Sequence, residues 1–185
     1  MPLPQSVSVF CGSSEFVSQD YKDAAHKLGK ILVQEGMRLV YGGSRMGLMG
    51  VVADSVMSEG GQAIGFITQT LHDFEIGHDG LTELHIVDSM HERKRLMFEH
   101  SDAIIVLPGG FGTLDEVIEV ITWRQIRLHT KPIVILNINE YWTDLFDTFA
   151  SHMIQNGFVQ PAHRDIYYLA PSIEDIMPYL KTYTP

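Results

Sequence analysis

Three glycine-rich segments carry the residues best suited to chemistry, and each one follows a short apolar run. They are Cys11-Gly12-Ser13-Ser14, the stretch from Tyr41 to Gly50, and the stretch from Pro108 to Glu116. Glycine lets backbone N–H groups approach an anion closely, and the start of a following helix adds the positive end of a dipole. One such segment could be a plain turn. Three at one sheet edge favour a ligand that bears a phosphate.

The spacing of these glycines excludes two common nucleotide sites. No glycine is followed by Lys-Ser or Lys-Thr, as a Walker A loop requires. Neither Gly109-x-x-Gly112 nor the segment from Gly43 to Gly47 matches the fingerprint of dinucleotide-binding folds. The pattern therefore favours a mononucleotide over NAD.

Short apolar runs alternate with amphipathic stretches along the whole chain, which predicts strands that alternate with helices. The expected strands are Val7–Cys11, Met37–Tyr41, Ala63–Phe66, Leu84–Val87, Ala103–Leu107, Pro132–Leu136 and Ile166–Leu169. The expected helices are Asp20–Gln34, Leu48–Ser58, Met90–His100, Thr113–Leu128, Trp142–Asn156 and Ser172–Leu180, the last with Ser172 as N-cap. Thr68–Leu81 is irregular and polar, which predicts a surface loop.

The strands do not alternate between polar and apolar residues, which is typical of a parallel sheet covered on both faces. We therefore predict one α/β domain over residues 1–185: a doubly wound, mainly parallel, Rossmann-like sheet with helices on both faces. Ligands bind to such sheets beyond the carboxyl ends of the strands, where the three glycine-rich segments fall.

The composition of the chain limits which classes of partner it is expected to bind. The chain of 185 residues has 13 basic and 23 acidic side chains, a net charge of −10, which disfavours nucleic acid and anionic membranes as main partners. No apolar run approaches the roughly 20 residues of a membrane span. The single cysteine, Cys11, excludes an intrachain disulfide and is expected to be a small packed residue. With no secretory signal in the first ten residues, we expect a cytoplasmic protein.

Two sequence motifs of this chain match the motifs of one protein family. Pro108 to Glu116 reads Pro-Gly-Gly-x-Gly-Thr-x-x-Glu, and Met90 to Lys94 reads Met-x-x-Arg-Lys. The chain resembles the LOG family, the cytokinin riboside 5′-monophosphate phosphoribohydrolases, often mislabelled lysine decarboxylases. The resemblance extends from about Val7 to about Pro171. Plant members have Gly-Ser-Val where this chain has Ser44-Arg45-Met46, a departure that bears on substrate preference.

The resemblance implies hydrolysis of the N-glycosidic bond of a purine nucleoside 5′-monophosphate, without a cofactor or a metal. It implies Glu116 and Arg93 as the catalytic pair. Glu116 near a helix start is expected to be ionised, to stabilise positive charge on the ribose and to deprotonate water. The implied substrate-binding residues are Gly43, Ser44, Met90, Lys94, Gly109, Gly110, Gly112 and Thr113. The family also implies a homodimer through the 113–128 helix, whose apolar residues exceed one face.

Several alternatives remain open from the sequence. Glu116 could only complement a helix dipole, and Arg93 could be a solvated charge. A carrier or sensor of the same fold, such as the molybdenum-cofactor carriers, would bind a nucleotide without turnover. A decarboxylase would use pyridoxal phosphate on a lysine, and Lys94 is the lysine that lies in a motif. Histidines between His72 and His91 match no zinc spacing, so we expect no metal site.

Overall fold

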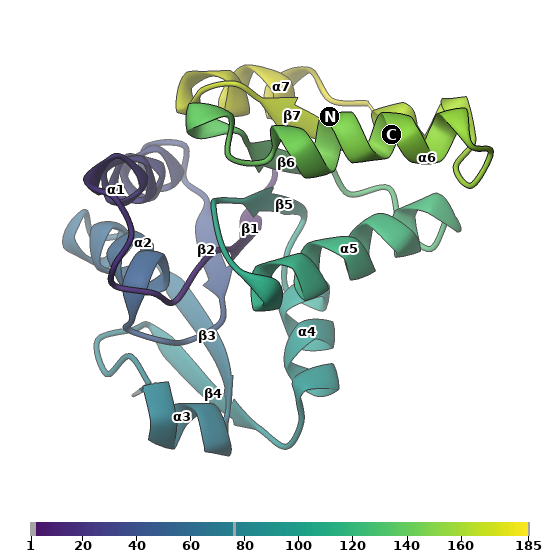
Figure 1. The fold of residues 1–185 in the computed structure, drawn as a ribbon. Coiled ribbons are helices and arrows are strands. Elements are labelled where there is room, and N and C mark those ends of the chain that lie inside the picture. Colours follow the sequence, from purple (N-terminus) through teal and green to yellow (C-terminus); the bar gives the residue numbers. More distant parts are fainter. Residues whose placement is uncertain (1–2, 76, 185) are drawn as a thin grey trace.

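The computed structural model describes residues 3–75 and 77–184, which form a parallel sheet with helices on both faces (Figure 1). The seven strands lie in the order β4-β3-β2-β1-β5-β6-β7. They are β1 (Ser6–Phe10), β2 (Arg38–Tyr41), β3 (Ala63–Thr68), β4 (Glu83–Val87), β5 (Ala103–Val106), β6 (Ile133–Leu136) and β7 (Tyr168–Ala170). The α-helices are α1 (Gln19–Gln34), α2 (Gly47–Ser58), α3 (Gln69–Glu75), α4 (Met90–Glu99), α5 (Phe111–Gln125), α6 (Ala150–Gln155) and α7 (Ile176–Thr182).

Two apolar layers hold the helices on the sheet. One contains the buried faces of α1, α2 and α7, and the other contains those of α4 and α5. Figure 1 shows α1 and α2 on one side of the strands and α4 and α5 on the other. The predicted doubly wound α/β fold with helices on both faces is therefore confirmed.

The strand order reverses beside β1, and this reversal determines where a ligand can bind. The chain runs outward from β1 to β4 and then returns past β1 to β5. In register, Val9 pairs with Tyr41 of β2, and Phe10 pairs with Val106 of β5. The three glycine-rich turns that follow these strands therefore leave the same edge, side by side. In open α/β sheets this reversal is the usual site of ligand binding.

The predicted surface loop over Thr68–Leu81 is wrong in part, because it contains α3. This helix has little apolar periodicity, the signal on which the prediction depended. Polar contacts support it instead: Leu71 donates its N–H to the Thr68 hydroxyl at 3.3 Å. Gln69 also donates to Asp73 at 2.9 Å, one helical turn further along the chain.

Each of two predicted helices consists of two consecutive helical elements in the structure. The stretch expected from Trp142 to Asn156 is a π-helix over Asp144–Phe149 followed by α6. The stretch from Ser172 begins as a 3₁₀ turn over Ile173–Asp175 and continues as α7. Ser172 forms a capping box with Asp175, which confirms it as an N-cap.

Candidate active site

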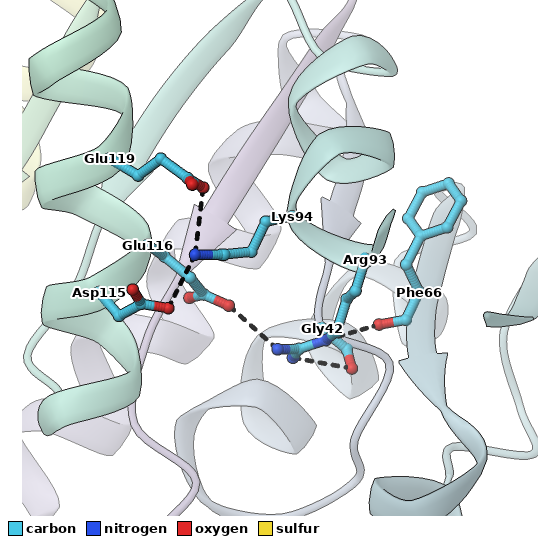
Figure 2. Close-up of polar contacts among 7 residues, drawn as sticks. All are labelled: Gly42, Phe66, Arg93, Lys94, Asp115, Glu116 and Glu119. Carbon is cyan, nitrogen blue, oxygen red and sulfur yellow. Dashed lines mark hydrogen bonds and ion pairs between the residues drawn. The ribbon is translucent and has the colours of Figure 1, made fainter. Parts of the chain in front are cut away.

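Arg93 and Glu116 form a buried ion pair between α4 and α5. Arg93 is only 6% exposed, and its Nη1 donates to Oε1 of Glu116 at 3.2 Å. The same guanidinium donates from Nε to the Phe66 carbonyl at 2.9 Å and from Nη2 to the Gly42 carbonyl at 3.2 Å (Figure 2). The arginine is therefore fixed to β3 and to the turn after β2, and it holds the carboxylate of α5 in one orientation.

Gly42 is required by this contact. A Cβ atom on Gly42 would lie 2.0 Å from Nη2 of Arg93, so any other residue there would displace the guanidinium from its hydrogen bonds. The glycine of the second turn thus makes room for the guanidinium. The sequence placed this glycine in a ligand-binding turn and gave no sign that it contacts Arg93.

The electrostatics of Glu116 differ from the expectation of a carboxylate ionised by a helix start. Glu116 is the sixth residue of α5, beyond the first turn, and is 8% exposed. Burial raises the pKa of Glu116 to about 7, although the Arg93 charge acts in the opposite direction. A carboxyl group with this pKa exchanges a proton at neutral pH, which suits a general acid or base.

Lys94 lies on the other side of Glu116 and contacts two carboxylates of α5. Its Nζ is 3.0 Å from Oδ2 of Asp115 and 3.3 Å from Oε2 of Glu119 (Figure 2). Burial lowers the pKa of Lys94, but the hydrogen bonds to Asp115 and Glu119 outweigh burial and raise it above its ordinary value. Lys94 is therefore a charged residue that braces α4 against α5, and its role in substrate binding stays a prediction.

The Pro108–Gly110 turn leads into α5, and its glycines have different roles. A Cβ on Gly109 would lie 2.1 Å from Oγ1 of Thr113, a buried residue, so Gly109 is required for packing. A Cβ on Gly110 or on Gly112 would meet nothing within 4 Å. Packing therefore does not explain these two glycines. They leave open space beside the first amides of α5, which have no partner within the helix.

A cavity of about 290 Å³ opens beside this turn, where the sheet order reverses. Backbone from the ends of β1 and β5 forms one wall, and larger side chains of the segments around it form the other. The lining residues are Gly12, Ser13, Ser14, Val17, Tyr21, Pro108, Gly109, Gly110 and Tyr141. A groove with exposed amides and aromatic rings suits a ligand with both an anionic and an apolar part.

Of the predicted substrate-binding residues, Gly109 and Gly110 line the cavity, and six lie outside its lining: Gly43, Ser44, Met90, Lys94, Gly112 and Thr113. Gly43 has φ +75°, a conformation that favours glycine, and Ser44 is fully buried. The Ser44 hydroxyl accepts the N–H of Met46 at 3.1 Å, which shapes the second turn. Met90 begins α4 and is 39% exposed. The substrate contacts of all six residues stay predictions.

Sequence reasoning missed two residues that shape the site. His78 is buried, donates its N–H to the Gly43 carbonyl at 3.0 Å, and places Nε2 2.9 Å from Oδ1 of Asp54. It braces the second turn. Tyr141 lines the cavity, and its position just after β6 was the signal that could have indicated it.

Over residues 3–75 and 77–184, no group of three or more His, Cys, Asp or Glu side chains could hold a metal ion.

Cys11 lies at the end of β1, close to the ion pair. It is a free thiol, 6% exposed, as expected for a packed residue. Burial raises the pKa of Cys11, and the nearby Glu116 charge raises it further. A thiol that stays protonated is a poor nucleophile, so the site offers Glu116 rather than Cys11 as its reactive group.

Comparison with known proteins agrees with the geometry. Residues 49–180 match the family described as possible lysine decarboxylase. A probable cytokinin riboside 5′-monophosphate phosphoribohydrolase of Oryza sativa subsp. japonica is 45% identical over 97% of this chain and 78% of its own length. Cytokinin riboside 5′-monophosphate phosphoribohydrolases of Arabidopsis thaliana and Rhodococcoides fascians are each 44% identical. The alignments cover 97% and 94% of this chain, and 84% and 87% of those proteins.

Solved structures with this fold include proteins of another function. The molybdenum cofactor binding protein of Rippkaea orientalis superposes with a TM-score of 0.72 at 21% identity, over 96% of this chain and 95% of the other. The molybdenum cofactor carrier protein of Chlamydomonas reinhardtii gives 0.72 at 18% identity, over 95% of both chains. At these identities the likeness shows the fold alone. The identity to the phosphoribohydrolases is much higher and extends over nearly the whole chain. This chain therefore belongs to the LOG family.

Proposed function

We propose that this protein hydrolyses the N-glycosidic bond of purine nucleoside 5′-monophosphates, with adenine or an N6-substituted adenine as the base. The products are the free base and ribose 5-phosphate. The observation that carries the proposal is the buried Arg93–Glu116 pair on a helix whose first amides have no partner within the helix and adjoin open space at Gly110 and Gly112. The names of the relatives support the same reaction.

Glu116 has the properties that this reaction needs. When the bond between C1′ and the base nitrogen breaks, its electron pair leaves with the base, and positive charge develops on the ribose. An ionised Glu116 stabilises that charge and takes a proton from the attacking water, whose oxygen bonds to C1′. The departing base nitrogen takes up a proton from solvent, and Glu116 returns the proton of the attacking water to solvent, which restores the carboxylate. Arg93, held by the Phe66 and Gly42 carbonyls, keeps the carboxylate aimed while the charge develops.

The 5′-phosphate is assigned to the start of α5. The amides of Gly110 and Gly112 lie there next to open space, and the buried Thr113 packs beneath the turn at Gly109. A helix N-terminus stabilises an anion through its unpaired N–H groups and its dipole. The net charge of −10 makes such local recognition necessary, because the protein as a whole repels an anionic substrate.

The two other functions considered from the sequence have less support. A carrier needs no buried acid–base pair, and only the fold connects this chain with the cofactor carriers. A pyridoxal phosphate enzyme needs a lysine that can become neutral to form a Schiff base. Lys94 does not fit that role, because Asp115 and Glu119 hold its ammonium group and raise its pKa.

We also propose a homodimer through α5. Val117 and Val120 face the core, whereas Ile118 is 46% exposed on the same helix. Ile121 is partly buried and packs against the core. Ile118 is therefore the residue to perturb.

No helix among the described residues is long and apolar enough to cross a membrane. A cytoplasmic setting is part of the proposal, and the free thiol of Cys11 suits a reducing compartment.

Replacement of the reactive carboxylate tests the proposed function. Glu116→Gln keeps the shape of the side chain and removes the charge, so turnover of AMP is expected to fall about 10²–10⁴-fold. AMP should still bind, because its phosphate contacts lie on the turn. Glu99→Gln, on the exposed face of α4, is the matched control and should act like wild type. Near wild-type turnover by Glu116→Gln would remove Glu116 from the mechanism.

A further inference from the structure

All three carbonyl oxygens of the Pro108–Gly110 turn accept hydrogen bonds from the protein. The Pro108 carbonyl accepts the N–H of Gly12 at 3.1 Å, and the Gly110 carbonyl accepts the N–H of Leu114 at 3.0 Å. Between them, the Gly109 carbonyl accepts the hydroxyl of Tyr141 at 2.8 Å. The turn therefore directs its acceptors into the protein, and its amides are left for a ligand.

The bond from Tyr141 differs from the other two because a side chain makes it. The peptide unit between Gly109 and Gly110 is flanked by two residues without Cβ atoms, so its rotation meets little steric resistance. In a trans peptide the C=O and N–H point in opposite directions. Rotation of this unit would place a carbonyl where the Gly110 N–H now lies, and a carbonyl repels an anion.

The segment after β6 is built to deliver Tyr141 to this position. Asn139 and Glu140 have φ values of 54° and 57°, a left-handed conformation that is unfavourable for residues with a Cβ. Asn137 holds the segment in place, since its Oδ1 accepts the N–H of Trp142 at 2.7 Å and its Nδ2 donates to the Thr143 hydroxyl at 2.9 Å. Strain that is held in this way at a cavity is typical of a functional position.

Tyr141 itself remains at the surface of the cavity. Its side chain is 43% exposed, although the adjacent Trp142 is only 4% exposed and anchors the segment. The ring of Tyr141 packs edge-on against Tyr21, with 5.6 Å between centroids, and both rings line the cavity. The Tyr141 ring also packs edge-on against Trp142, with 4.7 Å between centroids, so two neighbours hold the ring while its hydroxyl reaches the Gly109 carbonyl.

We propose that Tyr141 is a positioning residue that locks the Gly109–Gly110 peptide with its N–H directed at the 5′-phosphate. The inference rests on the proposed function for the identity of the anion. Its action is on binding of the phosphate rather than on the chemical step, because the hydroxyl contacts the turn and not Glu116.

Tyr141→Phe tests the proposal, because it removes the hydroxyl and keeps the ring. Tyr167→Phe is the matched control: its hydroxyl donates to the Phe146 carbonyl at 2.6 Å, outside the cavity lining. Both variants lose one bond from a tyrosine to a carbonyl. The measurements are kcat and KM for AMP, and the Kd values of ribose 5-phosphate and of adenine by calorimetry.

For Tyr141→Phe we expect KM for AMP and Kd for ribose 5-phosphate to rise about five- to tenfold, the ratio that loss of one hydrogen bond produces. The kcat at saturation, the Kd of adenine and the melting temperature relative to Tyr167→Phe should change little. Unchanged ribose 5-phosphate affinity, an equal loss of adenine affinity, or a loss confined to kcat would each overturn the proposal. If wild type binds ribose 5-phosphate but does not hydrolyse AMP, the proposed function fails while the binding arm still tests Tyr141.

Discussion

The raised pKa of Glu116 predicts an unusual pH dependence of the reaction. The ionised carboxylate is the active form, and burial raises its pKa to about 7. With that value about a tenth of the enzyme is ionised at pH 6 and about nine tenths at pH 8. We therefore expect kcat/KM for AMP to rise roughly tenfold over this range and then to level off. A carboxyl of ordinary pKa would give no rise, because it would be ionised throughout.

Neighbouring charges provide a test that the substrate cannot imitate, although its phosphate also titrates near pH 6. The Arg93 charge lowers the pKa of Glu116, and the Asp115 charge raises it. Arg93→Gln should therefore move the acid limb of the profile to higher pH, and Asp115→Asn should move it to lower pH. A limb that belongs to the phosphate of AMP would stay in place in both variants.

The assay is kcat/KM for AMP at closely spaced pH values from 5 to 9, for wild type and both variants, at constant ionic strength. Circular dichroism at each pH confirms that the proteins stay folded. Asp115→Asn is the safer variant, because Asp115 lies at the exposed end of a contact with Lys94. A flat profile between pH 6 and 8 would refute the role given to Glu116. Acid limbs that shift in the same direction in both variants would refute it as well.

The turn and the interface give further predictions. Gly112→Ala should leave the melting temperature unchanged, since its Cβ meets nothing within 4 Å, and should raise KM for AMP about tenfold or more by filling the phosphate space. Gly109→Ala should instead lower the melting temperature by several degrees, because its Cβ meets Thr113; equal melting temperatures would contradict this distinction. Ile118→Glu should convert the dimer to a monomer in light scattering, and an unchanged dimer would place the interface elsewhere.

Much of the fold could be predicted because its signals are local. The short apolar runs and the glycines after them predicted the parallel strands and the edge at which ligands bind. The helix α3 could not be predicted from apolar periodicity, because a threonine cap and a Gln69–Asp73 contact support it. The π-helix over Asp144–Phe149 was hidden as well, since its periodicity differs little from that of an α-helix over one turn.

The motifs place Arg93 and Glu116 in one candidate site, but they do not indicate the electrostatics of Glu116. The motifs pointed to Arg93 and Glu116, and the structure brings the two within 3.2 Å. The pKa of Glu116 depends on burial by parts of the chain that are remote in sequence. Its position near a helix start therefore did not predict the raised pKa. The contacts of Tyr141 with Gly109 and of Arg93 with the Gly42 carbonyl join distant segments, and no local pattern announces them.

The most direct test of the account is the comparison of AMP with adenosine as substrates of the wild-type protein. The two differ only in the 5′-phosphate, which is assigned to the start of α5, so its absence should cost most of the catalytic efficiency. We predict release of adenine and ribose 5-phosphate in equal amounts from AMP, with kcat/KM for adenosine lower by at least about 10²-fold. Comparable values for the two substrates, or no adenine from any purine 5′-monophosphate, would contradict the account.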